Sequence, residues 1–175
     1  FKNVDYSKLI LIKYLGGEPF ITPQLKELIY FLDQKNIIQN ITFWTNTNIT
    51  IFPKKLIPSL KKFKKVNIAL SLDGIGALNE YIRYGKSWSV IEKNVNRWVS
   101  EKNKNFDIWV HTTVQAYNFH ALSKIKQFCD EKNLFFYGAL LSNPNYLHIN
   151  VLPESYIKKV QDEVNEKYLN SYNFN

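Results

Sequence analysis

Apolar runs of strand length alternate with stretches of helical spacing along almost the whole of this 175-residue chain. The expected strands cover residues 9–15, 41–45, 66–72, 106–115 and 134–141. Between them, apolar residues recur at intervals of three and four, which is typical of amphipathic helices. The first strand is apolar at almost every position, as expected of a strand that is buried on both faces. This alternation predicts βα units around a parallel sheet, so the fold class is α/β.

Helix start signals mark where the helices are expected to begin. A threonine, a serine, an asparagine or a proline stands at the start of each stretch of helical spacing. The expected helices begin at Thr22, Pro53, Ser87, Asn118 and Pro153. A loop at residues 142–145 and an extended segment at residues 146–152 are expected just before the last of them.

The composition fits one core of ordinary domain size and disfavours some partners. Hydrophobic residues make up 45% of the chain, but it has neither a run of about 18 apolar residues nor a signal-peptide pattern. We therefore predict a soluble, cytoplasmic protein without a membrane segment. The net charge is +8, yet Arg83 and Arg97 are the only arginines, which disfavours a nucleic-acid partner. The lysines within residues 61–65 are interpreted as a solvated helix end, with a phosphate site as the alternative.

Cysteine and methionine are almost absent from the chain. Cys129 is the only cysteine and there is no methionine, not even at position 1. A single thiolate cannot form an internal disulfide, and it cannot hold a zinc ion or an iron–sulfur cluster, so no metal site is predicted. Cys129 shares a helical face with Leu122 and Ile125, which predicts a core position. The missing initial methionine indicates a fragment or a processed piece.

Polar residues follow the first four expected strands, where ligands bind in folds with parallel sheets. The segments concerned are Gly16-Gly17-Glu18-Pro19, Thr45-Asn46-Thr47-Asn48, Ser71-Leu72-Asp73-Gly74 and, after the fourth strand, Gln115. Each of them alone is an ordinary turn, and the first, taken alone, is most simply a strand-to-helix turn that carries a surface glutamate. Their recurrence at successive strand ends predicts a site for a polar ligand.

One histidine falls on the same strand face as other polar residues. His111 shares a face with Trp109, Thr113 and Gln115, because side chains alternate along a strand. A histidine among such residues is most simply a core residue whose ring nitrogens are hydrogen-bonded, and we interpret His111 in that way. A role as a base or as a metal ligand is the alternative.

The segment Ile12 to Pro19 resembles the GGEP motif of radical S-adenosylmethionine (SAM) enzymes. Residues 71–74 followed by residues 79–84 resemble the region around the fourth strand of that family, and residues 143–154 resemble members with a twitch subdomain. The resemblance implies a partial (βα)6 barrel, similar to a TIM barrel, that is missing its first strand. Residues 1–141 would then hold strands two to six, and residues 142–175 a C-terminal extension that begins a twitch region.

The same resemblance implies roles in binding SAM. The backbone and glutamate of the motif would bind the amino group of the methionine portion, through Gly16, Gly17, Glu18 and Pro19. Asn46 would line the same pocket. Ser71 and Asp73 would face the ribose hydroxyls, Arg83 would pair with the methionine carboxylate, and Gln115 and Asn118 would lie near the adenine.

Members of this family hold a [4Fe-4S] cluster in a CxxxCxxC loop and use it to cleave SAM to a 5′-deoxyadenosyl radical. The CxxxCxxC motif does not occur in this sequence. The resemblance therefore implies a fragment of such an enzyme, with an unknown substrate. SAM and the [4Fe-4S] cluster would be cofactors of the intact protein, and this chain by itself is expected to be inactive, to hold no cluster and to bind SAM weakly or not at all. The alternative is a cluster-free descendant that binds SAM, a nucleotide or a protein partner without catalysis. A missing first strand would also leave an exposed sheet edge, which favours self-association.

Overall fold

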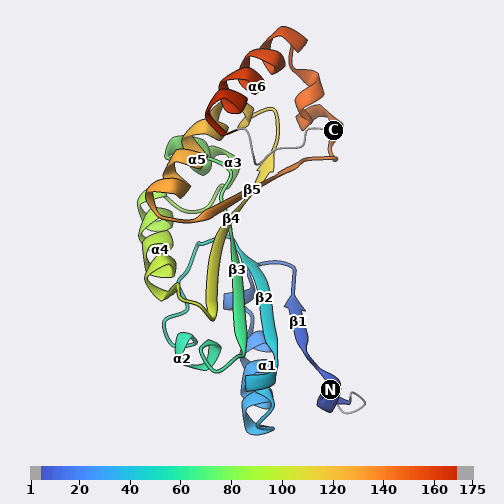
Figure 1. Ribbon diagram of the computed structural model, residues 1–175, viewed down its shortest axis with the longest axis vertical. Coiled ribbons are helices and arrows are strands. Elements are labelled where there is room, and N and C mark those ends of the chain that lie inside the picture. Colours follow the sequence, from blue (N-terminus) through green and yellow to red (C-terminus); the bar gives the residue numbers. More distant parts are fainter. Residues whose placement is uncertain (1–4, 169–175) are drawn as a thin grey trace. The chain divides into compact units, whose positions relative to one another are not determined.

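The computed structural model describes residues 5–168 of the chain, which form two compact units (Figure 1). Unit 1 contains the residues up to Leu70 together with Lys93–Trp109, and unit 2 contains Ser71–Glu92 and the residues from Val110 onward. Five strands form one parallel sheet in which each strand lies next to the one that follows it in the chain, which confirms the predicted α/β class. The two predicted domain ranges are 1–141 and 142–175. Residues 1–4 of the first range and residues 169–175 of the second lie outside the described residues.

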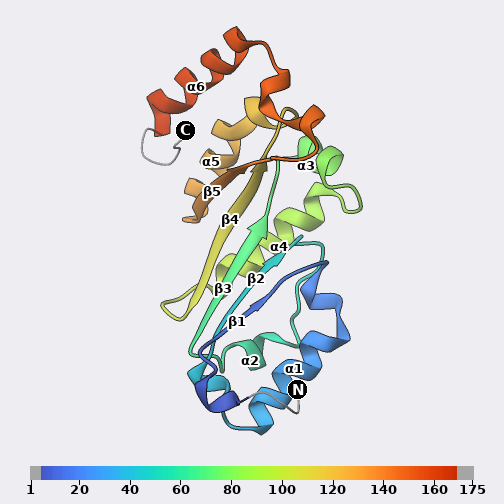
Figure 2. The ribbon, with the colours of Figure 1, turned by 90° about the vertical axis from the view of Figure 1, so that its right-hand side faces the viewer.

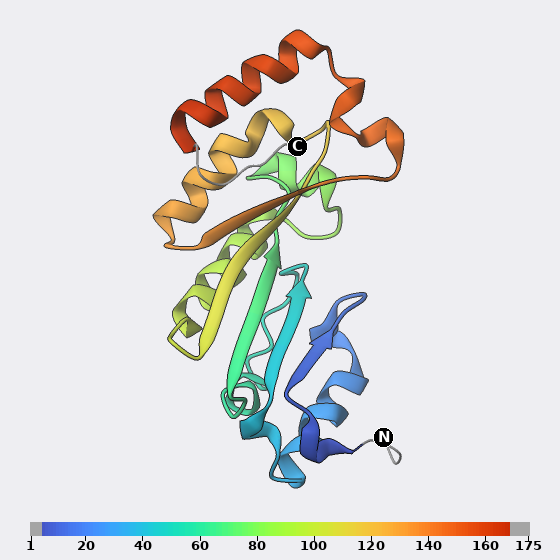
Figure 3. The same cartoon turned by 45° about the vertical axis from the view of Figure 1, so that its right-hand side comes forward.

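Unit 1 is built on the strands β1 (Leu11–Tyr14), β2 (Thr42–Thr47) and most of β3 (Lys65–Ser71). The pairing is parallel, with Leu11 opposite Thr42 and Thr42 opposite Lys65. The helices α1 (Pro23–Gln34) and α2 (Ile57–Leu60) lie on one side of these strands (Figure 3). Alternate residues of β2 are buried and half-buried, as expected when helices cover only one face of a strand.

Local chemistry explains where α1 begins. Pro23 occupies the first helical position, where its missing N–H costs nothing, and Thr22 precedes it in an extended conformation. The apolar face of the helix then buries Leu25, Ile29 and Leu32 completely or nearly so. The predicted start of this helix at Thr22 is confirmed.

The first strand differs from the prediction. Leu11 is 45% exposed, and its neighbours Ile10 and Leu15 are 74% and 60% exposed. The expectation of a strand buried on both faces is therefore wrong. The reason is the position of β1 at the edge of the sheet, where it pairs with β2 alone. An edge strand can be rich in apolar residues without being enclosed.

The lysines within residues 61–65 are all exposed, but only Lys61 and Lys62 directly follow α2, and Lys65 is the first residue of β3. Lys61 Nζ lies 2.6 Å from Glu101 Oε2, and Lys62 Nζ lies 2.6 Å from Asp33 Oδ2. These lysines are exposed, so the pairs contribute little to stability. The interpretation as a solvated helix end is confirmed for Lys61 and Lys62 and is wrong for Lys65, which begins a strand.

Unit 2 contains β5 (Phe135–Leu140), the helices α3 (Ala77–Ile82) and α5 (Leu122–Glu131), and α6 (Glu154–Tyr168). Figure 2 shows α5 and α6 next to each other in this unit. Two further elements, β4 (Phe106–Val114) and α4 (Trp88–Glu101), contribute residues to both units. No helix within residues 5–168 has the length and apolar character that crossing a membrane requires.

Two local predictions in unit 2 fail. The segment expected to be extended, residues 146–152, instead forms two 3-10 turns, at Asn145–Leu147 and Ile149–Val151. Its backbone groups are satisfied locally, since the amide of His148 donates to the carbonyl of Asn145 over 3.1 Å. The short helix α3 was not predicted, because six residues are too few to show a helical period.

Candidate functional site

The turn after β1 holds the Gly-Gly-Glu-Pro segment. Gly16 has a φ of +98° and Gly17 a φ of +55°, in the region where other residues are strained. An added Cβ atom would meet nothing within 4 Å at either position. The backbone conformation, and not crowding, is thus what requires glycine here.

Glu18 is turned toward the end of β2 and is only 8% exposed. Its Oε1 accepts hydrogen bonds from Thr47 Oγ1 at 2.8 Å and from the amide of Phe20 at 3.4 Å. Its Oε2 accepts from the amide of Asn48 at 2.7 Å. Burial raises the pKa of the Glu18 carboxyl from 4.5, while the hydrogen bonds from these three donors act to lower it. The alternative of a surface glutamate is therefore wrong.

Asn46 offers an acceptor that the described residues do not use. It lies on the half-buried face of β2, one residue before Thr47. Its Oδ1 is buried and accepts no hydrogen bond within residues 5–168. A buried acceptor without a donor costs free energy, and a bound donor group would remove that cost.

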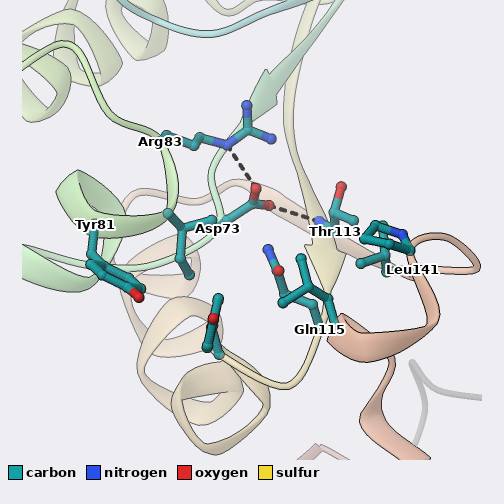
Figure 4. Close-up of a pocket in the computed structure, with 10 residues that line it drawn as sticks. Asp73, Tyr81, Arg83, Thr113, Gln115 and Leu141 are labelled. Atoms are coloured by element: carbon teal, nitrogen blue, oxygen red, sulfur yellow. Dashed lines mark hydrogen bonds and ion pairs between the residues drawn. The ribbon is translucent and has the colours of Figure 1, made fainter.

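Asp73, in unit 2, is 4% exposed and forms an ion pair with Arg83. The resemblance instead implies that Arg83 pairs with the methionine carboxylate of SAM. Asp73 Oδ2 lies 2.8 Å from Arg83 Nε, and Asp73 Oδ1 accepts from the amide of Thr113 at 2.8 Å (Figure 4). Arg83 thus already has a carboxylate partner in its own unit. Asp73 is held in place between the end of β4 and the residue that follows α3.

Asn118 ties the segments around Asp73 together and is completely buried. Its Oδ1 accepts from the amide of Gln115 at 2.8 Å, and its Nδ2 donates to the carbonyls of Asp73 at 3.0 Å and Thr113 at 2.9 Å. Both amide hydrogens are therefore used by the backbone. Asn118 acts here as a structural residue that holds the ends of β3 and β4.

A pocket of about 550 Å³ opens in unit 2 beside Asp73 (Figure 4). Asp73, Arg83 and Gln115 contribute its polar groups, and Tyr81 and Tyr117 contribute aromatic rings. The two tyrosine rings meet edge to face, with their centroids 5.5 Å apart. Sequence reasoning missed both tyrosines. Tyr117 is two residues beyond Gln115, which is a usable signal, but Tyr81 belongs to the helix that was not predicted.

The predicted site residues fall into two groups. Gly16, Gly17, Glu18, Pro19 and Asn46 belong to unit 1, and Ser71, Asp73, Arg83, Gln115 and Asn118 belong to unit 2. Within unit 2, three of them line one pocket. Ser71 ends β3 and is 8% exposed.

His111 lies half-buried on β4, so the prediction of a core position is wrong. Its ring stacks on that of Tyr137, with the centroids 5.7 Å apart. Burial lowers the pKa of His111 below 6.5, the charge of Asp73 raises it, and the charge of Arg83 lowers it further. Tyr137, whose ring stacks on that of His111, is itself 49% exposed.

Cys129 is completely buried in α5, as predicted. Burial raises the pKa of its thiol to about 12. Within residues 5–168 there is no group of three or more His, Cys, Asp or Glu side chains that is arranged to hold a metal ion. The residues that the structure describes therefore offer no thiolate for a cluster.

No family model matches the chain, and no curated protein matches it. Solved structures do match. The structure of anSMEcpe with bound AdoMet (SAM) and the Cp18Cys peptide is 19% identical with a TM-score of 0.65, over 94% of this chain and 50% of that one. SuiB from Streptococcus suis, bound to S-adenosylmethionine, is 17% identical with a TM-score of 0.61, over 89% of this chain and 36% of that one. The chain thus spans half or less of these proteins and has the α/β fold of that part.

Proposed function

We propose that this chain is part of a radical SAM protein of the twitch type and that it binds SAM at the carboxyl ends of its strands. The observation that carries the proposal is the Gly-Gly-Glu-Pro turn directly after β1, with positive φ at Gly16 and Gly17. It occurs in a fold shared with structures that hold AdoMet. In this proposal the sheet is part of a partial (βα)6 barrel that is missing its first strand.

Asn46 supports a place for the ammonium group of SAM in unit 1. An ammonium group carries only donors, and it needs acceptors such as carbonyl and amide oxygens. The buried Oδ1 of Asn46 is an acceptor of this kind, without a donor among the described residues. In the proposal this atom and backbone carbonyls of the turn at Gly16–Pro19 accept from the ammonium group.

The pocket of unit 2 supports a place for the adenosine portion. Gln115 is 7% exposed and lines the pocket, where its amide can pair with the adenine edge. The carboxylate of Asp73 has about four acceptor sites, so it can accept from ribose hydroxyls while it holds Thr113 and Arg83. Ser71 and Arg83 keep their proposed places next to the ribose and the methionine carboxylate, and Asn118 acts by positioning Gln115.

The residues of this chain do not fit a [4Fe-4S] cluster. Cys129 is the only cysteine in the sequence, it is completely buried, and burial raises its pKa to about 12. A cluster of this kind is held by several thiolates. No step of the reductive cleavage of SAM is therefore assigned to these residues.

The same lone cysteine favours a second candidate function. A cluster-free descendant would bind SAM or a nucleotide without cleaving it, and it would need no thiolate. Anaerobic reconstitution of the full reading frame with iron and sulfide separates the two. Cluster absorbance supports the radical SAM enzyme, whereas SAM binding without cluster absorbance supports the binding protein.

Calorimetric titration of this chain with SAM tests the binding site itself. We expect weak but saturable binding, which Asn46→Ala and Gln115→Ala each weaken about tenfold further, since each removes a hydrogen bond to a charged or buried ligand group. Gln39→Ala, at an exposed position away from the strand ends, serves as the control. Absence of saturable binding, or equal effects of all three variants, contradicts the proposal.

A further inference from the structure

We infer that Glu18 is a positioning residue: its side chain ties the turn after β1 to the end of β2 and does not contact the bound cofactor. The inference deepens the proposed function, because it gives the glutamate of the motif a role different from the one that the resemblance implies. It rests on contacts within unit 1 alone.

The carboxylate of Glu18 already has donors from its own chain. Thr47 Oγ1 and the amide of Asn48 donate over 2.8 and 2.7 Å, one to each carboxylate oxygen. Both hydrogen bonds link the turn after β1 to the end of β2, across 29 and 30 residues of sequence. Because only 8% of the surface of Glu18 is exposed, little of it is accessible to a ligand.

The hydrogen bonds of Glu18 continue into a second buried network. Thr47 Oγ1 accepts from the amide of Ile49 at 3.1 Å, and Asn94 Nδ2 donates to the carbonyl of Ile49 at 2.8 Å. Thr47, Ile49 and Asn94 are 1%, 0% and 4% exposed. Every member of this chain of contacts thus holds the loop that follows β2.

Ile49 has a strained backbone conformation, which this hydrogen-bond network holds in place. Its φ is +63°, a conformation that a β-branched residue adopts only when its surroundings impose it. The contacts through Thr47 and Asn94 are those that fix its amide and its carbonyl. Loss of Glu18 would remove the acceptor for Thr47 and loosen this loop, which directly follows Asn46.

Ligand binding by Glu18→Gln and Thr47→Val, with Thr42→Val at the other end of β2 as the matched control, tests the inference. The probes are S-adenosylhomocysteine and its analogue in which hydrogen replaces the amino group. A positioning role predicts that Glu18→Gln and Thr47→Val raise the Kd of S-adenosylhomocysteine by the same factor, about tenfold, because both loosen the groups that accept from its amino group. Neither variant should change the Kd of the analogue, and the control should change neither Kd. A rise for S-adenosylhomocysteine in Glu18→Gln but not in Thr47→Val would show direct contact of Glu18 with the ligand and overturn the inference.

Amide hydrogen exchange of the ligand-free chain provides a readout that does not depend on binding. We expect the amides of Asn48 and Ile49 to exchange at least about tenfold faster in Glu18→Gln and Thr47→Val than in Thr42→Val. Unchanged exchange in both variants would overturn the inference. If neither probe binds to the unaltered chain, the proposed function is wrong, and exchange alone decides the role of Glu18. If Glu18→Gln does not fold, Thr47→Val carries both measurements.

Discussion

Arg83 Nε lies 2.8 Å from Asp73 Oδ2, so two residues predicted to face different groups of a ligand pair with each other. The pair lies against the pocket of unit 2, where Asp73 also accepts from the amide of Thr113. A buried carboxylate needs such a partner, because an isolated charge away from water is costly. The pair therefore helps to shape the pocket before any ligand arrives.

Removal of either member of this pair leaves the other charge without compensation. We expect Asp73→Asn and Arg83→Met each to lower the free energy of unfolding by about 1–3 kcal/mol, and the double variant to lose less than the sum of the two. Urea denaturation of the four proteins in a double-mutant cycle measures this coupling. Simple additivity would show that the two side chains contribute independently.

Asn118 is expected to be among the most sensitive polar positions in unit 2. Asn118→Leu leaves the amide of Gln115 and the carbonyls of Asp73 and Thr113 without their partner, so we expect a loss of about 2–4 kcal/mol in the free energy of unfolding. Asn105→Leu, at an exposed asparagine, should change it by less than about 0.5 kcal/mol. Equal losses in chemical denaturation would contradict the structural role of Asn118.

His111 is expected to make stability depend on pH. Its pKa is lower in the folded protein than its ordinary value of 6.5, so the unfolded chain binds the proton more strongly. The stability that His111 contributes is present above pH 6.5. It is lost as the pH falls from 6.5 through the lower pKa of the folded state. Urea denaturation at pH about 7.5 and about 5.5 measures the loss, which His111→Phe should reduce. The same pH dependence in both proteins would show that other groups cause it.

Cys129 is expected to resist alkylation in the folded protein. The thiol is completely buried and its pKa is about 12, so thiolate is scarce at neutral pH and reagent cannot reach it. Iodoacetamide should modify it at least about 100-fold more slowly in buffer than in denaturing urea. Mass spectrometry over time gives both rates, and comparable rates would place Cys129 at an accessible surface.

Short-range chemistry explains the elements that were predicted correctly. The start of α1 follows from Thr22 and Pro23 alone, and the buried face of α4 follows from the spacing of Ile91, Val95 and Trp98. Prediction failed where the sequence pattern was short, as in α3, and where burial depended on neighbouring strands, as in β1. The exposure of β1 depends on its place at the sheet edge, which its own residues do not encode.

The sequence by itself determined which polar residues follow the strands, because strand ends and turns are set by local apolar runs, glycines and prolines. Only the tertiary structure decided what those residues contact. Two of the three donors to Glu18 are 29 and 30 residues away, and the amide that donates to Asp73 is 40 residues away. Such partners meet because parallel pairing brings the carboxyl ends of distant strands together, and that register is a property of the folded sheet.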